Sequence, residues 1–64
     1  MTTIKTQISA SGKKIELDTF NHNVFGDCYY IYVDGKSEHF QYGTSKLDVI
    51  FNEFVSEEFD LAHK

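Results

Sequence analysis

The chain has no proline, no tryptophan and no arginine, and its single cysteine is Cys28. One cysteine excludes a disulfide within the chain and fits a reducing compartment. Residues 1–6 contain no long apolar run of the kind that a signal peptide or a membrane span requires. We therefore expect a cytoplasmic protein that does not enter a membrane.

With 64 residues the chain is long enough for one domain, and we expect residues 1–64 to form a single unit. A domain of this size buries only about 60% of the surface that its unfolded chain exposes, so its margin of stability is narrow. No repeat, low-complexity stretch or linker divides the sequence.

Acidic residues outnumber lysines by ten to six, which gives a net charge of −4. The first part of the chain is basic through Lys5, Lys13 and Lys14, and the acidic excess follows it. Nucleic-acid binding depends on cations that replace phosphate counterions, so an acidic body disfavours it. A protein partner with a basic surface fits this charge better.

Residues 3–20 predict a β-hairpin around the short loop signal Ser11-Gly12. A two-residue loop there makes one face apolar and places an opposite-charge pair on the other, as a half-buried hairpin requires. A loop at Gly12-Lys13 would keep the same faces but lose the opposite-charge pair, so we expect the first register. Its pairs are Ile8–Ile15, Thr6–Leu17, Ile4–Thr19, Lys5–Asp18 and Gln7–Glu16.

Residues 28–33 are rich in β-branched and aromatic side chains and lead into Asp34-Gly35, a strong two-residue hairpin signal. We expect one face of this second hairpin to be the core face, since most of its side chains are apolar. Its members are Tyr29, Ile31, Val33, Phe40 and Tyr42. The predicted pairs are Tyr29–Phe40, Ile31–Glu38, Val33–Lys36, Tyr30–His39, Tyr32–Ser37 and Cys28–Gln41.

From Lys46 onward the apolar residues recur at helical spacing. They are Leu47, Ile50, Phe51, Phe54 and Val55, followed by Leu61 and Ala62. Ser45 is a suitable N-cap for this helix. Glu58 interrupts the apolar stripe, so we expect the regular helix to end near Glu57 or Glu58.

Together these elements predict an α+β fold, in which two β-hairpins form an antiparallel four-stranded sheet and one C-terminal α-helix packs on one face (ββββα). A lone hairpin is marginal, so the apolar helix stripe and the apolar sheet face need each other. The order of the strands stays open at this stage.

No residue pattern indicates catalysis, a metal site or a cofactor. Cys28 with His22 or His39 as its base lacks the spacing of any cysteine-enzyme family, and a strand cysteine is commonly a packing residue. The histidines and the cysteine together match no zinc spacing. The glycines are isolated at expected turns, so no phosphate-binding loop is present. We therefore expect neither an enzyme nor a cofactor.

Aromatic residues of the third predicted strand would face away from the helix, and tyrosine is common at the anchors of interfaces. Acidic residues also gather on the solvent side of the predicted helix, where they would suit a basic partner surface. The predicted partner-binding residues are Tyr30, Tyr32, His39, Glu53, Glu57 and Asp60.

We interpret the chain as a non-catalytic protein-binding domain, a small acidic inhibitor or regulator, whose acidic helix could mimic nucleic acid. In size, acidity and aromatic content it is similar in type, without a shared motif, to small proteins that phages and mobile elements make against host enzymes. These include anti-CRISPR proteins and inhibitors of nucleases or DNA-repair enzymes. The alternatives are a homodimer, and a single-stranded nucleic-acid-binding module that stacks bases on Tyr30 and Tyr32.

Overall fold

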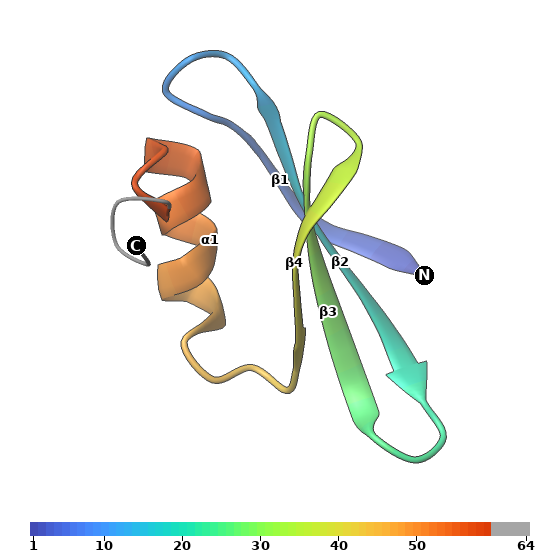
Figure 1. The fold of residues 1–64 in the computed structure, drawn as a ribbon. Coiled ribbons are helices and arrows are strands. Elements are labelled where there is room, and N and C mark those ends of the chain that lie inside the picture. The colour runs from blue at the N-terminus through green and yellow to red at the C-terminus, as the bar shows by residue number, and fades with distance from the viewer. Residues whose placement is uncertain (60–64) are drawn as a thin grey trace.

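A computed structural model describes residues 1–59 as four strands followed by one helix (Figure 1). The elements are β1 (Thr2–Ile8), β2 (Lys14–His22), β3 (Gly26–Val33), β4 (Lys36–Tyr42) and α1 (Leu47–Ser56). The strands form one antiparallel sheet in the order β1-β2-β3-β4. The predicted α+β fold is therefore confirmed, and the strand order is that of a meander.

The first hairpin differs from its predicted register. Its loop spans residues 9–13, where the Ser9 N–H donates to the Lys13 carbonyl oxygen at 2.7 Å, and a bulge lies at Ile4. The observed pairs include Ile8–Lys14, Gln7–Ile15, Thr6–Glu16 and Lys5–Leu17. Both registers considered from the sequence are wrong, since residues 5–8 of β1 have slipped by an odd number of residues relative to either register and have exchanged faces. Ile8, which has changed face, is 59% exposed, and Ile4, which lies in the bulge, is 53% exposed.

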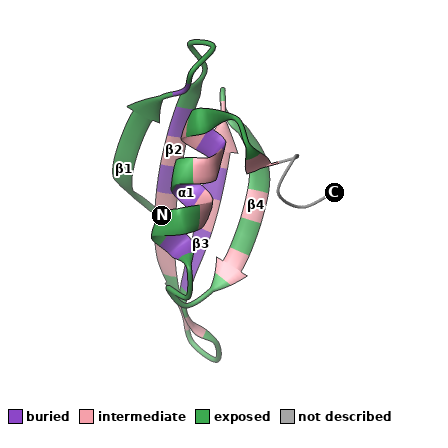
Figure 2. Cartoon of the chain, turned by 90° about the vertical axis from the view of Figure 1, so that its left-hand side faces the viewer, coloured by how far each residue is buried: buried purple, intermediate pink, exposed green. Residues whose placement is uncertain are grey.

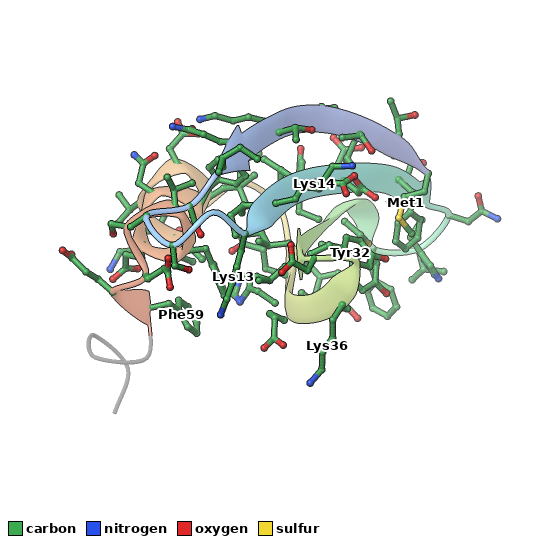
Figure 3. All side chains as sticks on the ribbon, turned by 90° about the horizontal axis from the view of Figure 1, so that it is seen from above. Met1, Lys13, Lys14, Tyr32, Lys36 and Phe59 are labelled. Atoms are coloured by element: carbon green, nitrogen blue, oxygen red, sulfur yellow. The ribbon has the colours of Figure 1, made fainter. Side chains whose placement is uncertain are left out.

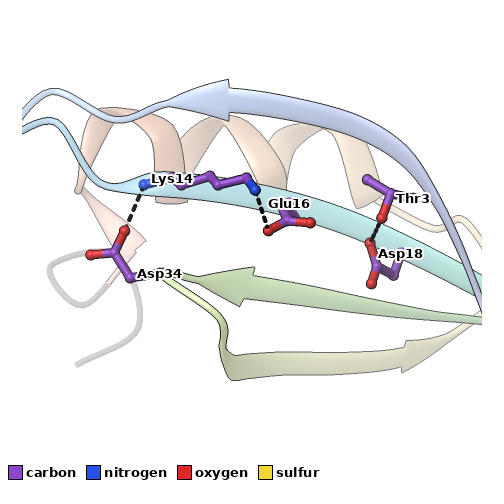
Figure 4. Close-up of polar contacts among 5 residues, drawn as sticks. All are labelled: Thr3, Lys14, Glu16, Asp18 and Asp34. Carbon is purple, nitrogen blue, oxygen red and sulfur yellow. Dashed lines mark hydrogen bonds and ion pairs between the residues drawn. The ribbon is translucent and has the colours of Figure 1, made fainter.

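The second hairpin turns where the sequence predicts. Asp34 and Gly35 have φ angles of 50° and 84°, the left-handed conformations that a tight two-residue hairpin turn requires. The Asp34 carboxylate also accepts a hydrogen bond of 2.8 Å from the backbone N–H of Lys14, which ties this turn to the start of β2 (Figure 4). The pairs next to the turn, Val33–Lys36 and Tyr32–Ser37, are those predicted.

Farther from the turn the register of β4 shifts by one residue, because a bulge leaves Glu38 without a partner in β3. The observed pairs are Ile31–His39, Tyr30–Phe40, Tyr29–Gln41 and Cys28–Tyr42. The predicted pairs in this part of the hairpin are therefore wrong. Phe40 and Tyr42 lie on the face away from the helix, and His39 lies on the face toward it.

The core lies between α1 and the central strands β2 and β3 (Figure 2). Its buried members are Ile15, Leu17, Tyr29, Ile31, Leu47, Phe51 and Phe54. The helical members belong to the predicted stripe, and the strand members alternate as expected for a half-buried sheet. Phe51 has an exposed fraction of 0%, and the Lys5 Nζ lies 4.7 Å from the centroid of its ring. A lysine thus covers the core where the predicted register placed isoleucines.

Neither end of α1 uses a side-chain cap. The helix begins after Lys46, which has a φ of 57°, and no side chain bonds to its first turn, so the predicted cap by Ser45 is wrong. At the other end Glu57 is left-handed with a φ of 62°, and its N–H donates to the Phe54 carbonyl oxygen at 3.2 Å. The predicted end near Glu57 is confirmed.

The predicted continuation of the apolar stripe at Leu61 and Ala62 lies outside the described residues, as does the predicted site residue Asp60. Within residues 1–59 there is no helix with the length and apolar character needed to cross a membrane.

Candidate functional site

The sheet face turned away from α1, which we call the open face, is rich in aromatic side chains. Residues that alternate with the core residues of β2, β3 and β4 share this face, because successive side chains of a strand point to opposite sides. The aromatic residues placed there by the strand pairing are Phe20, Tyr30, Tyr32, Phe40 and Tyr42. No other helix or strand of residues 1–59 covers them (Figure 1).

Tyr30 lies at the centre of a set of ring contacts on the open face. Its ring centroid is 4.7 Å from that of Phe40, its cross-strand partner, and 5.9 Å from that of Tyr32 on the same strand. On its other side the Phe20 ring of β2 stacks at 5.9 Å. Pairs at these separations are favourable beyond the area that they bury.

The ring contacts continue from Phe40 toward the turn between β2 and β3. Tyr42 lies edge-on to Phe40 with a centroid separation of 4.9 Å, and Phe25 lies 4.9 Å from Tyr42. The His22 ring contacts Phe25, also at 4.9 Å. The His22 Nδ1 accepts hydrogen bonds from the N–H groups of Val24 and Phe25, which shapes the turn that carries Phe25. We call the connected set the aromatic row; it comprises His22, Phe25, Tyr42, Phe40, Tyr30, Tyr32 and Phe20.

The aromatic row is only partly shielded from solvent. Phe25, Phe40 and Tyr42 are 57%, 38% and 55% exposed, whereas the remaining members are half-buried against one another. Large exposed apolar side chains also occur at other positions of the sheet and its turns, namely Met1, Ile4, Ile8 and Val24. On the helix, by contrast, Val49 is the exposed large apolar residue within the described chain. The exposed rings of Phe25, Tyr42 and Phe40 contact one another, and contiguous apolar exposure is typical of interaction surfaces.

Carboxylates border the aromatic row on β2. Asp18 pairs with Tyr30 across the strands, and its Oδ1 accepts a hydrogen bond of 2.7 Å from the Thr3 hydroxyl (Figure 4). Glu16 pairs with Tyr32, and its Oε1 lies 3.2 Å from the Lys14 amine. The end of the row formed by Tyr30 and Tyr32 therefore has carboxylates beside it.

At the same end the Tyr32 hydroxyl donates to the Sδ of Met1 at 3.7 Å, so the N-terminus reaches the row (Figure 3). This contact spans the sheet from β3 to the residue that precedes β1.

The predicted site residues do not form one surface. Tyr30 and Tyr32 lie on the open face as expected, but His39 lies on the helix side, so its expected place beside them is wrong. Its ring is 6.3 Å from that of Phe54 and 6.0 Å from that of Phe59. The bulge at Glu38 causes this exchange, and it brings Phe40 into the position expected for His39.

The predicted acidic group on the helix is used differently. The Glu57 Oε2 accepts hydrogen bonds from the backbone N–H of Ser11 and, at 3.0 Å, from the hydroxyl of buried Ser9. These bonds, those from Ser11 first, hold the pKa of Glu57 below its ordinary value, with help from the charge of Lys13. Glu57 thus fastens the end of α1 to the loop of the first hairpin. Glu53 is half-buried on α1, on the opposite side of the sheet from the tyrosines.

The residues considered for nucleophilic or metal chemistry lie apart from one another or already hold a turn through hydrogen bonds. Cys28 is 1% exposed, and its Sγ lies 3.6 Å from the Gly26 carbonyl oxygen. His39 is on the other face of the sheet, and His22 holds the turn described above. Among residues 1–59 no group of three or more histidines, cysteines and acids could hold a metal ion.

A hollow of about 300 Å³ lies on the helix side, where the loop of the first hairpin meets the end of α1. Its apolar walls include Ile15, Val33 and Phe54, and its charged walls include Lys13 and Glu57. Because Glu57 is already hydrogen-bonded to the loop, the wall of this hollow is part of the contact that holds α1 in place.

The sequence interpretation missed most of the aromatic row. Phe20 was recognisable, because it lies three residues after the core residue Leu17 and so has the opposite parity on β2. Phe40 and Tyr42 were assigned to the core, and only the bulge at Glu38 places them on the open face. Phe25 belongs to a turn, where strand alternation gives no prediction.

Comparison of the chain with protein-family models, with curated proteins and with solved structures found no match. Its function is therefore argued from the site itself.

Proposed function

We propose that the protein is a non-catalytic binding domain that docks on another protein through its open face and acts as a regulator or inhibitor by occupying a surface of that partner. The observation that carries the proposal is the aromatic row. Its neighbouring ring centroids are 4.7 to 5.9 Å apart, and its exposed members lie on a sheet face that no described element covers. The lone cysteine supports a cytoplasmic setting as part of the same proposal.

The rings are suited to binding because the strands already hold them in position. Aromatic side chains have few rotatable bonds, so their immobilisation in an interface costs little conformational entropy. Burial of apolar surface contributes roughly 25 cal/mol per Å², and tyrosine keeps a hydroxyl that can pair with the partner. Tyr30, flanked by rings on β2, β3 and β4, would be the centre of the contact.

The positions of the lysines support a protein partner over a nucleic acid. The basic residues of the first hairpin do not form a cluster on the open face, since Lys5 lies over Phe51 on the helix side. Lys14 is 3.2 Å from Glu16, and Lys36 is 3.7 Å from Glu38. A single-stranded nucleic acid stacked on the row would therefore meet carboxylates where its phosphates require cations.

The test is to truncate the exposed rings without touching the core. Phe40→Ser combined with Tyr42→Ser should lower capture of the partner at least about tenfold, because anchors of an interface carry most of its binding energy. Val49→Ser removes an exposed apolar side chain of α1 and is the matched control, which should bind as the unchanged protein does. Circular dichroism on heating checks that both variants remain folded.

A photo-reactive phenylalanine analogue locates the contact directly. Placed at position 42 it should cross-link the partner, and placed at position 49 it should not. Cross-linking from position 49 alone would contradict the proposal.

The rival function, binding of single-stranded nucleic acid, draws support from the same rings, because bases stack on strand aromatics. Titration with a twelve-nucleotide oligothymidine at low salt separates the two. Binding that weakens steeply as salt is added would favour the rival, and we expect no binding.

A further inference from the structure

The open face has an acidic border that the proposed function does not yet use. Asp18 and Glu16 lie directly across from Tyr30 and Tyr32 in the antiparallel pair of β2 and β3. Residues in such positions have Cβ atoms about 4.5–5.5 Å apart. Tyr30 and Tyr32 therefore each have a carboxylate beside them on the same face of the sheet.

This negative charge is only partly balanced within the described chain. Lys14, which pairs with Ile8, is the lysine that the strand register places on this face, and its amine lies by Glu16. Asp18 takes part in no ion pair among residues 1–59, and its hydrogen-bond donor is the neutral hydroxyl of Thr3. A carboxylate has about four acceptor positions, so Asp18 can accept further donors.

We propose that the partner presents an arginine to the open face, with its guanidinium over the Tyr30 ring and Asp18 as its counter-ion. The inference rests on the proposed function and names the chemistry of the partner. A guanidinium stacks on aromatic faces, is weakly hydrated and forms two parallel hydrogen bonds with a carboxylate. A ring with an acid beside it offers both contacts at once.

The remainder of the row determines what accompanies the arginine. Phe40, Tyr42 and Phe25 extend from Tyr30 toward the far end of β4 and carry no charge. The occupant is therefore a protein segment in which arginine stands beside apolar side chains. The net charge of −4 adds long-range attraction for such a segment.

A second copy of this chain would not supply that group. The sequence contains no arginine, and a face-to-face pair of copies would bring Asp18 and Glu16 of each protomer toward an equally acidic surface. The inferred partner is consequently a different protein.

The experiment uses the full chain and two capped peptides, Leu-Arg-Leu-Arg-Leu and the same sequence with citrulline in place of arginine. Citrulline keeps the shape and removes the charge. Backbone amide NMR at low ionic strength gives the affinity and the residues contacted. We expect shifts at Tyr30, Phe40 and Tyr42, with the arginine peptide binding at least fivefold more tightly.

Asp18→Asn removes the charge but keeps an oxygen for the Thr3 hydroxyl, and it should reduce the preference for arginine to less than twofold. Asp48→Asn removes an equal charge from the first turn of α1 and is the matched control. It should leave the preference unchanged.

Equal affinities of the two peptides at the open face would overturn the inference and leave the proposed function standing. Absence of shifts at the open face with both peptides would also overturn the inference. The proposed function would then be tested separately, by whether the analogue at position 42 cross-links the partner. If sedimentation reveals a dimer that Phe40→Ser with Tyr42→Ser abolishes, the aromatic row is the interface of that dimer. Both the inference and the proposed function would then be overturned.

Discussion

The two faces of the sheet are built from alternate residues of the same strands, yet they differ in side-chain type and in burial. The covered face carries Ile15, Leu17 and Ile31, which are 1%, 3% and 0% exposed beneath α1. The open face carries rings, of which Phe40 and Tyr42 are 38% and 55% exposed. Aliphatic side chains fill a core without leaving any polar group to satisfy, whereas the rings partly cover one another. The covered face therefore supplies most of the stability, and the open face is available for contact.

The largest effect is expected when one phenylalanine from each face is removed and the losses of stability are compared. Phe51→Ala removes a ring that is 0% exposed in the core, and we expect it to lower the free energy of unfolding by about 3–5 kcal/mol. Phe40→Ala removes a ring from the open face and should cost about 1 kcal/mol, mainly through the lost contacts with Tyr30 and Tyr42. Urea denaturation followed by circular dichroism measures both. Equal losses would show that the open face is a second core.

The contact that fastens α1 over the covered face should depend on pH. Folding lowers the pKa of Glu57 from its ordinary value of 4.5, chiefly through the hydrogen bonds from Ser11. The stabilisation is therefore complete well above that value and is lost as the pH falls through the lowered pKa. Glu57→Gln should reduce the urea midpoint at neutral pH, and the gap from the unchanged protein should close in acid. A gap of constant size would contradict this role.

A smaller effect distinguishes two lysines. The Lys5 Nζ lies 4.7 Å from the centroid of the Phe51 ring at the edge of the core. Lys5→Ala should lower the free energy of unfolding by about 0.5–1 kcal/mol, because it removes the cation–π contact and the cover that the lysine stem gives to the core. Lys36 lies 3.7 Å from Glu38 in an exposed ion pair. Lys36→Ala should change the free energy of unfolding by less than about 0.5 kcal/mol. Thermal unfolding of both variants at low and high salt provides the comparison. A larger loss of stability from Lys36→Ala than from Lys5→Ala would contradict the prediction that Lys5 contributes more.

Local patterns were sufficient to predict the elements. The Asp34-Gly35 turn is where the sequence places it, because few residue pairs adopt two successive left-handed conformations so readily. The apolar spacing of Leu47, Phe51 and Phe54 likewise predicted both the helix and the side that it buries. Tyr30 and Tyr32 were correctly placed away from the helix, since Ile31 between them belongs to the core.

The register was not predictable from local patterns, and most of the aromatic row depends on it. The loop of residues 9–13 is held by contacts with α1, where the Ala10 N–H donates to the Val55 carbonyl oxygen at 2.9 Å and Ser9 bonds to Glu57. A helix more than forty residues away in sequence thereby takes part in setting the pairing of β1. No pattern within the hairpin carries that information.

The sequence by itself determined four strands, one tight turn and an amphipathic helix. Only the tertiary structure decided which side chains form the candidate site. The physical reason is that a strand has a period of two, so one extra residue in a bulge moves each following side chain to the other face. The bulge at Glu38 thus carries Phe40 and Tyr42 to the open face and His39 to the core side.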